Sequence, residues 1–195
     1  MNWKHFCKSI LAGSLLAASA SFAADGDELL GQLAPEWSEM EWFHSKPLKQ
    51  SELRGKVVLL RFWMTACPLC QNTSSALNEF HKKYAEKGLV VLGFYHSKPR
   101  PQPRAIAEVK DAADKLGFKF PVALDSEWKY LNKIWLTRDR SFTSASFLLD
   151  RNGKIQFVHH GGEYFDDRAD PNSQAARDYR AMQRKIEELL ALPAK

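Results

Sequence analysis

The stretch Lys56-Val-Val-Leu-Leu-Arg-Phe-Trp-Met64, followed closely by Cys67-Pro-Leu-Cys70, decides the fold of this chain. Its apolar run predicts a buried strand. Pro68 suits the first turn of a helix, where its missing N–H costs nothing. The start of a helix offers unpaired N–H groups and the positive end of the dipole, and both favour a thiolate. We therefore predict a reactive dithiol in which Cys67 attacks and Cys70 resolves the mixed disulfide.

Residues 1–23 have the pattern of a cleavable signal peptide. Lys4 and Lys8 are the only formally charged side chains there, and an apolar run follows from Ile10 to Ala20. The segment Ser21-Phe-Ala23 places small residues at both cleavage positions. The apolar run is too short for a comfortable membrane span of about 20 residues. We predict cleavage near Ala23 and export to the periplasm or an equivalent compartment; an uncleaved, membrane-tethered N-terminus is the alternative.

The sequence contains three cysteines, and the third, Cys7, lies in the segment that cleavage would remove. In an oxidising compartment, whether Cys67 and Cys70 are reduced or form a disulfide depends on a partner or substrate. A structural disulfide is the alternative, but a CxxC bridge closes a very small loop and constrains the unfolded chain little. The composition, with 45% hydrophobic and 26% charged residues, suits one soluble globular domain. The net charge of +5 comes without a dense basic run, so we expect no nucleic-acid partner.

Strand and helix patterns alternate along the rest of the chain. Residues 24–47 are expected to form an irregular N-terminal extension, and residues 48–195 the folded domain. Buried strands and a final hairpin are predicted over Val57–Trp63, Leu89–Tyr95, Phe120–Leu124, 145–149 and 154–158. Helices are predicted over 68–87, 104–116, 126–134 and 173–192. Ser126 is the expected N-cap of the third helix. This order predicts an α/β sandwich with a mixed sheet.

Four blocks of sequence carry a resemblance to a known family. They run from Leu53 to Cys70, Gly88 to Ser97, Phe120 to Asp125 and Phe147 to Ile155. In this order they resemble the TlpA-like and redoxin branch of the thioredoxin superfamily, and the run from Ile155 to Tyr164 is similar to exported DipZ-type thiol-disulfide domains. The resemblance implies a thioredoxin-like three-layer α/β/α sandwich with a mixed central sheet. It also implies an exported thiol-disulfide oxidoreductase whose redox-active centre is the Cys67–Cys70 disulfide, with no other cofactor.

The resemblance also indicates the partners. They would be protein thiol or disulfide substrates and a redox-recycling protein of the kind that is embedded in the membrane, and we expect the protein itself to be a monomer. The direction of electron flow stays open. A proline after the first cysteine resembles oxidising CPxC sites, whereas TlpA-like relatives are usually reductases.

Three positions depart from the family's pattern. The proline that faces the CxxC is replaced by Ser144, which follows Thr143. A non-proline cis bond costs about 3–4 kcal/mol, so this peptide is expected to be trans. Arg61 stands where many thioredoxins have a buried acid, and a guanidinium cannot act as a base. Thr73 stands where many TlpA-like proteins have a glutamate, so the group that deprotonates Cys70 is left unassigned.

Four further site residues are expected to flank the dithiol: Trp63, Pro68, Thr143 and Ser144. If Arg61 lies near Cys70, its charge favours the thiolate. A buried, unpaired arginine is costly, so we expect a carboxylate partner or a path to solvent for Arg61. His159 and His160 are neighbours on one strand, so only one of them can face inward.

His96 ends a strand on the side of the sheet where the active site is expected. It is a candidate base or a third metal ligand; the alternative is a loop-edge histidine bonded to backbone. With Cys67 and Cys70 it would supply soft ligands for Cu(I), so a metal-binding or metallochaperone protein is the alternative function. A redox-inert interaction module that keeps only the fold is another.

Overall fold

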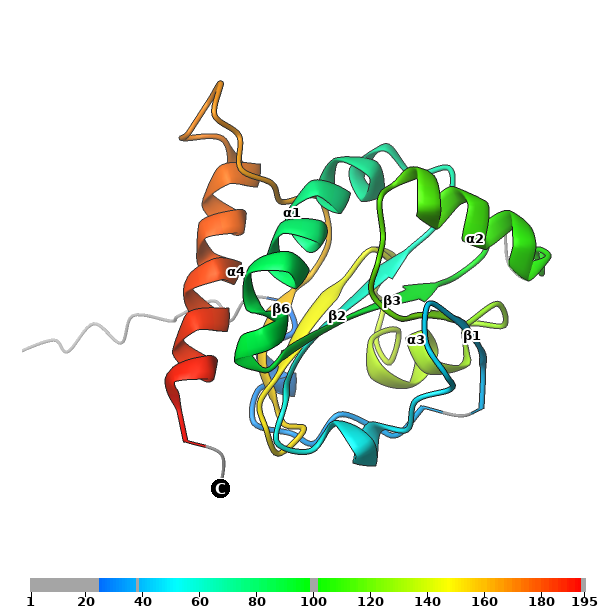
Figure 1. Cartoon of the computed structure of the whole chain (residues 1–195), viewed down its shortest axis with the longest axis horizontal. Coiled ribbons are helices and arrows are strands. Elements are labelled where there is room, and N and C mark those ends of the chain that lie inside the picture. The colour runs from blue at the N-terminus through cyan, green and yellow to red at the C-terminus, as the bar shows by residue number, and fades with distance from the viewer. Residues whose placement is uncertain (1–24, 38, 99–101, 194–195) are drawn as a thin grey trace, which may run out of the picture.

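The chain is described by a computed structural model over residues 25–37, 39–98 and 102–193 (Figure 1). The predicted signal peptide, residues 1–23, lies outside these ranges. Within them, no helix is long and apolar enough to cross a membrane.

One six-stranded sheet in the order β1-β4-β3-β2-β5-β6 forms the middle layer. Its strands are β1 (Glu41–Phe43), β2 (Val57–Trp63), β3 (Leu89–Tyr95), β4 (Val122–Leu124), β5 (Ser146–Leu149) and β6 (Ile155–His159). The strands β2, β3 and β4 are parallel, whereas β1, β5 and β6 pair with their neighbours in antiparallel fashion. The predicted mixed sheet and thioredoxin-like architecture are therefore confirmed.

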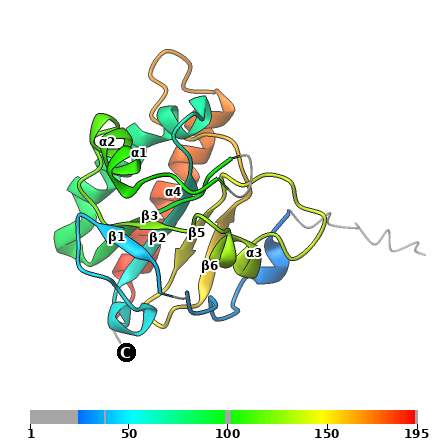
Figure 2. The ribbon, with the colours of Figure 1, turned by 90° about the vertical axis from the view of Figure 1, so that its right-hand side faces the viewer.

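Helices cover both faces of this sheet, as the side view in Figure 2 shows. They are α1 (Pro68–Tyr84), α2 (Ile106–Lys115), α3 (Lys129–Ile134) and α4 (Gln174–Ala191), with short 3-10 turns over Asp27–Leu29, Gln50–Leu53 and Ala85–Lys87. Apolar side chains of α1, α2 and α4 share one core cluster, and those of α3 belong to the cluster on the other face. The predicted strands and helices are present, with ends that differ by a few residues.

Strand β2 is buried along its whole length, as its apolar run predicts. Its side chains alternate between the two faces of the sheet. Leu59 and Trp63 pack in the cluster beneath α1 and α4, whereas Leu60 and Phe62 pack in the cluster that includes α3. Arg61 shares its face with Leu59 and Trp63, because residues two apart on a strand point the same way. The only charged residue of β2 therefore points toward α1 and α4.

The start of α3 differs from the sequence prediction. The helix begins at Lys129, after Trp128 as the N-cap residue. The carboxylate of Asp125, rather than the hydroxyl of Ser126, binds the first free N–H groups of the helix. Asp125 is buried and accepts hydrogen bonds from the backbone N–H groups of Tyr130 at 3.1 Å and Leu131 at 2.7 Å. Burial raises the pKa of this carboxyl, and the N–H donors of the helix oppose that shift. Asp125 binds the start of α3 because a buried carboxylate needs hydrogen-bond donors, and the free N–H groups of a helix start provide them.

The N-terminal segment is less irregular than expected. Its strand β1 pairs with β4, and Leu33 forms an isolated bridge to Lys154 beside β6. Trp37 is buried in the core, with its ring edge against Phe94 and Tyr130 at centroid distances of 5.5 and 5.7 Å. The described part of this segment therefore belongs to the sheet and its core. A strand of three residues is too short to show a period of two in the sequence, so the pattern did not reveal it.

Candidate active site

The two cysteines lie where β2 gives way to α1. Cys67 is the N-cap residue of α1, and its Sγ accepts a hydrogen bond from the backbone N–H of Cys70 at 3.2 Å. Pro68 occupies the first helical turn, as predicted, and is exposed. Both cysteines are free thiols in this structure. Cys67 is half-buried, whereas Cys70 is only 2% exposed, so Cys67 is the sulfur that a partner protein can reach.

The hydroxyl of Ser144 lies against both thiols. Its Oγ is 3.5 Å from the Sγ of Cys70 and 3.9 Å from the Sγ of Cys67. Thr143, just before it, is buried, and the backbone N–H of Phe62 donates to the carbonyl of Ala145 at 3.0 Å. That bond fixes the loop beside β2. A position where the family resemblance implies a proline ring therefore presents a hydrogen-bonding group to the reacting sulfurs.

The two thiols share one proton. The hydrogen bond between them is the largest influence on both, and it lowers the pKa of Cys70 to about 5 against the effect of burial. The charge of Arg61 and the hydroxyl of Ser144 lower it further. The same hydrogen bond, together with burial, raises the pKa of Cys67. At neutral pH the pair therefore holds one negative charge, which the accessible Cys67 carries when the proton moves to Cys70.

Arg61 is 1% exposed and is held by uncharged groups. Its guanidinium donates to the hydroxyl of Ser146 at 3.2 Å and to the carbonyl of Gly162 at 2.9 Å. It also lies 5.5 Å from the centroid of the Tyr164 ring. No carboxylate is within ion-pair distance of it in the part of the chain that the structure describes. The expectation of a carboxylate partner or a path to solvent is therefore wrong, because a hydroxyl, a carbonyl and a ring contact the buried cation instead. The Nε of Arg61 has no hydrogen-bond partner among the described residues.

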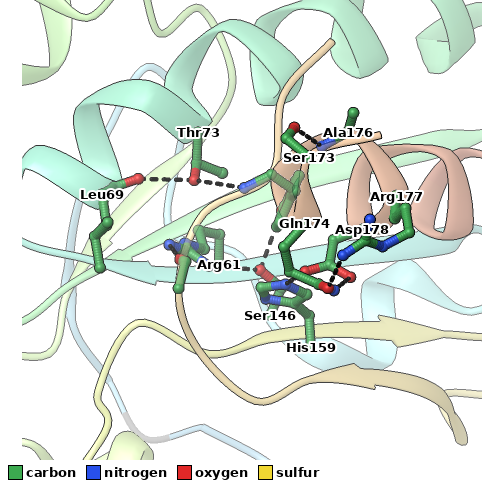
Figure 3. Close-up of polar contacts among 12 residues, drawn as sticks. Arg61, Leu69, Thr73, Ser146, His159, Ser173, Gln174, Ala176, Arg177 and Asp178 are labelled. Carbon is green, nitrogen blue, oxygen red and sulfur yellow. Dashed lines mark hydrogen bonds and ion pairs between the residues drawn. The ribbon is translucent and has the colours of Figure 1, made fainter. Parts of the chain in front are cut away.

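The carboxylates of Asp178 and Glu163 form hydrogen bonds with side chains other than Arg61. Asp178 on α4 accepts from Gln174 at 2.6 Å and lies 3.2 Å from Nε2 of His159 (Figure 3). Glu163 accepts from the side-chain amide of Asn72 at 2.7 Å. Burial, followed by the charge of Arg61, lowers the pKa of His159 to about 4, so this ring is neutral at physiological pH.

Only one of the two adjacent histidines is buried, as predicted. His159 is buried against α4, and His160 is exposed. The strand β6 ends at His159, and the two rings lie nearly parallel with their centroids 6.1 Å apart.

Thr73 joins α1 to the segment that follows β6. Its hydroxyl donates to the carbonyl of Leu69 at 2.8 Å and accepts from the backbone N–H of Tyr164 at 3.4 Å. Figure 3 shows Thr73 and Leu69 on this helix and Arg61 on the strand below. Through these two hydrogen bonds Thr73 holds the backbone of Tyr164 against α1. A threonine hydroxyl cannot act as the base that a glutamate carboxylate provides in many family members.

The structure does not bring His96 together with the two thiols as a metal site. Over the described ranges, no group of three histidine, cysteine or acidic side chains is arranged to hold a metal ion. His96 is buried with its ring edge against Trp128, at a centroid distance of 5.3 Å. Burial, and then the charge of Lys98, lower the pKa of His96 to about 4, which makes it a weak base at neutral pH.

Trp63 lies in the core cluster that also contains Cys70. It is buried, and its ring packs edge-on against Tyr95 at 5.5 Å and Phe118 at 5.2 Å. Its contribution to the site is through the backbone: its carbonyl accepts from the N–H of His96 at 3.0 Å. It therefore helps to fix the strand ends from which the active-site loops depart.

Sequence reasoning missed Ser146 and Tyr164 as site residues. Ser146 is the cross-strand partner of Arg61, and its hydroxyl lies 3.0 Å from that of Tyr164. A buried arginine in a strand signals that acceptors must lie nearby. The sequence does not identify them, because they come from β5 and from a loop more than 80 residues away along the chain.

A dithiol at the N-terminus of α1, on a mixed sheet of this order, defines a thiol-disulfide oxidoreductase domain with a thioredoxin fold. The chain belongs to the Redoxin family, whose family model matches residues 30–176. It is 30% identical over 148 residues to the thiol-disulfide oxidoreductase ResA of Bacillus anthracis, covering 75% of this chain and 79% of that protein.

The chain is also similar to one part of a larger protein. It is 30% identical over 125 residues to Protein DipZ of Mycobacterium tuberculosis, which covers 62% of this chain and 17% of DipZ. The chain thus matches a small portion of DipZ and most of ResA.

Solved structures share the fold. A thiol-disulfide isomerase from Corynebacterium glutamicum aligns with a TM-score of 0.63 at 24% identity, covering 82% of this chain and 98% of that one. A thioredoxin-family thiol:disulfide interchange protein from Chlorobium tepidum aligns with a TM-score of 0.62 at 19% identity, covering 82% and 96%. At these identities the likeness supports the architecture.

Proposed function

We propose that this protein exchanges disulfides with other proteins in an exported compartment, with Cys67 as the nucleophile and Cys70 as the resolving thiol. The observation that carries the proposal is the asymmetry of the pair: Cys67 is reachable at the start of α1, whereas Cys70 is buried behind it. An external disulfide must therefore meet Cys67 first.

The reaction has two exchange steps. The thiolate of Cys67 attacks one sulfur of the partner's disulfide, forms a mixed disulfide and releases the other partner sulfur, which takes up a proton. The thiolate of Cys70 then attacks Cys67, forms the Cys67–Cys70 disulfide and releases the second partner thiol. The reverse sequence oxidises a partner dithiol. A redox-recycling protein then restores the starting state.

Exposed apolar side chains in the two segments that carry the thiols and Ser144 support a protein substrate. Leu69, between the cysteines, is 40% exposed, and Phe142, shortly before Ser144, is 64% exposed. Exposed aromatic and aliphatic side chains at a reactive site favour contact with a polypeptide segment.

The Cys70→Ser variant is expected to accumulate mixed disulfides with partner proteins. Cys67 can still attack, but without Cys70 nothing inside the protein releases the adduct. The measurement is non-reducing electrophoresis of protein isolated from its native compartment, followed by identification of the adducts. The matched control is the Cys67→Ser/Cys70→Ser double variant, which should form none. Adducts in the double variant, or none with Cys70→Ser, would contradict the proposal.

We also propose that residues 1–23 are removed during export. The mature protein is expected to begin at Ala24 and to occur in the periplasmic fraction, which N-terminal sequencing of that fraction will test. Replacing the small residue before the cleavage point, Ala23→Phe, should block processing, because signal peptidases need small residues there. The neighbouring Phe22→Ala change should not. Wild-type protein that keeps Met1 and remains in the membrane fraction would overturn this assignment.

A further inference from the structure

We propose that the hydroxyl of Ser144 is a catalytic group of the resolving step: it takes the proton of the Cys70 thiol and passes its own proton to the partner sulfur that leaves Cys67. The inference rests on the proposed function and supplies the proton acceptor for Cys70 that the sequence left unassigned. It also gives a role to a serine at a position where the family resemblance implies a proline.

The hydroxyl of Ser144 contacts both reacting sulfurs. Its Oγ lies 3.5 Å from the Sγ of Cys70 and 3.9 Å from the Sγ of Cys67, within the reach of a hydrogen bond to the large sulfur atom. Among the described residues it has no other hydrogen-bond partner. A hydroxyl has one donor and two acceptor sites, so it can accept a proton from one sulfur while it donates to another.

The loop that carries Ser144 is held on both sides of this residue. Before it, Nε1 of Trp135 donates to the carbonyl of Phe142 at 2.6 Å. After it, the backbone N–H of Phe62 donates to the carbonyl of Ala145 at 3.0 Å. Ala145 is buried, whereas Ser144 is half-buried. The hydroxyl is therefore fixed beside the thiols and still open to a partner sulfur attached to the first cysteine.

The resolving step needs a proton acceptor for Cys70. The largest influence that lowers the pKa of Cys70 is the hydrogen bond to the Cys67 thiol, and burial opposes it. Once Cys67 belongs to a mixed disulfide it has no proton to donate, so this influence is lost and the burial remains. The pKa of Cys70 therefore rises at the step in which its thiol has to lose a proton.

The charged and titratable groups around the dithiol do not supply this acceptor. Arg61 on β2 is a cation without a lone pair to offer. His96 after β3 and His159 on β6 are neutral rings whose pKa values, lowered mainly by burial, lie at about 4. The carboxylates of Asp178 on α4 and of Glu163 after β6 carry negative charge, and they accept hydrogen bonds from side chains other than the thiols.

Two other hydroxyls on this face have different partners. The hydroxyl of Thr73, on the turn of α1 after Cys70, is bonded to two backbone groups. The hydroxyl of Tyr164 lies 3.0 Å from that of Ser146, and burial raises its pKa. In the part of the chain that the structure describes, Ser144 is thus the one hydroxyl that is hydrogen-bonded to the Sγ of Cys70.

The step balances without an added acid or base. The sulfur of Cys70 attacks the Sγ of Cys67 in the mixed disulfide, the bond between these two sulfurs forms, and the bond to the partner sulfur breaks. The proton of Cys70 moves to Oγ of Ser144 while the Ser144 proton moves to the departing sulfur, so the hydroxyl is regenerated. The two cysteines are oxidised and the partner leaves as a reduced, neutral thiol. An ordinary thiolate, with a thiol pKa of about 8.5, leaves slowly, so protonation assists its departure.

The test measures attack and resolution as separate steps. Reduced protein is mixed with glutathione disulfide, quenched with acid at successive times and analysed by mass spectrometry, which separates the reduced protein, the glutathione adduct and the internal disulfide. Ser144→Ala should slow the conversion of the adduct into the internal disulfide by about tenfold or more, because a positioned proton-transfer group contributes at least that much. Formation of the adduct should change far less. Ser144→Thr keeps a hydroxyl and should retain fast resolution, and the control Ser75→Ala, which removes an exposed hydroxyl of α1, should change neither step.

The pH dependence distinguishes a relay from a structural effect. Without the hydroxyl, Cys70 must first ionise to solvent, so the resolution rate of Ser144→Ala should rise about tenfold per pH unit below the thiol pKa and approach the wild-type rate in alkali. Wild-type resolution should depend on pH less steeply. A Ser144→Ala rate that is lower than the wild-type rate by the same factor at every pH would overturn the relay.

The outcomes separate this inference from the proposed function. If Ser144→Ala resolves the adduct as fast as wild type, Ser144 is not the relay and the proposed function stands. If wild-type protein forms neither an adduct nor an internal disulfide, the proposed function itself fails. Should Ser144→Ala not fold, the wild-type protein decides: its resolution rate in mixtures of light and heavy water should follow a curve, since two protons move together, and a straight line would overturn the inference.

Discussion

Replacing Cys67 with serine is expected to abolish disulfide exchange, lowering its rate by about a thousandfold or more. A serine hydroxyl is not ionised at neutral pH and cannot attack a disulfide. The remaining thiol, Cys70, is 2% exposed and has no path to an external sulfur while the helix start is folded. The measurement is the reduction of a model protein disulfide such as insulin by the reduced protein, under multiple turnover.

Two further variants give this prediction its controls. Cys70→Ser should still react once with a disulfide and then stop as the mixed disulfide, which separates attack from resolution. Ser144→Ala removes the hydroxyl that lies 3.5 Å from Cys70 but leaves both sulfurs, so measurable turnover should remain. If Cys67→Ser kept its turnover and Cys70→Ser failed to form an adduct, the roles of the two sulfurs would be reversed.

Replacing Trp135 with alanine is expected to lower the free energy of unfolding by about 3–5 kcal/mol. Trp135 is fully buried, and its ring lies edge-on to Phe147 of β5 at 5.7 Å. The guanidinium of Arg140 lies 4.2 Å from the ring centroid, and Nε1 donates to the carbonyl of Phe142 at 2.6 Å. This residue thus joins the end of α3 to β5 and to the loop that carries Ser144. The loss is a large part of the roughly 5–15 kcal/mol that stabilises a typical domain.

Urea denaturation of the reduced protein provides the measurement. Trp135→Phe keeps most of the apolar contact but loses the hydrogen bond to Phe142, so it should cost clearly less than the alanine change. Phe142→Ala removes a side chain that is 64% exposed and should change stability by about 0.5 kcal/mol or less. A Trp135→Ala variant within about 1 kcal/mol of wild type would show that the loop is held by other contacts.

The strand β2 and the start of α1 could be predicted because their signals are local. An unbroken apolar run specifies a buried strand, and Val57–Trp63 is the observed strand. A proline after the first cysteine fits the first turn of a helix, and the observed helix starts at Pro68. The Asn-Gly turn likewise specified the β5–β6 hairpin. In each case the information lies within a few residues of the element that it specifies.

Features that depend on contacts between distant parts of the chain were harder to predict from the sequence than these local elements. The edge strand β1 has three residues and gains its hydrogen bonds from β4, about 80 positions later. Asp125 rather than Ser126 binds the start of α3 because its burial, which depends on the packed sheet, obliges it to find donors. His96 stood at a plausible catalytic position, but packing buried it as a neutral ring.

The sequence by itself determined that this protein carries a CxxC dithiol at a strand-to-helix junction, and that Arg61, Thr73 and Ser144 replace the acids and the proline that usually surround it. Only the tertiary structure decided what these replacements do. It placed Ser144 against both sulfurs and surrounded Arg61 with neutral acceptors from β5 and the segment after β6. The physical reason is that the energy of a buried charge depends on every group within a few ångströms, and those groups are distant in the chain.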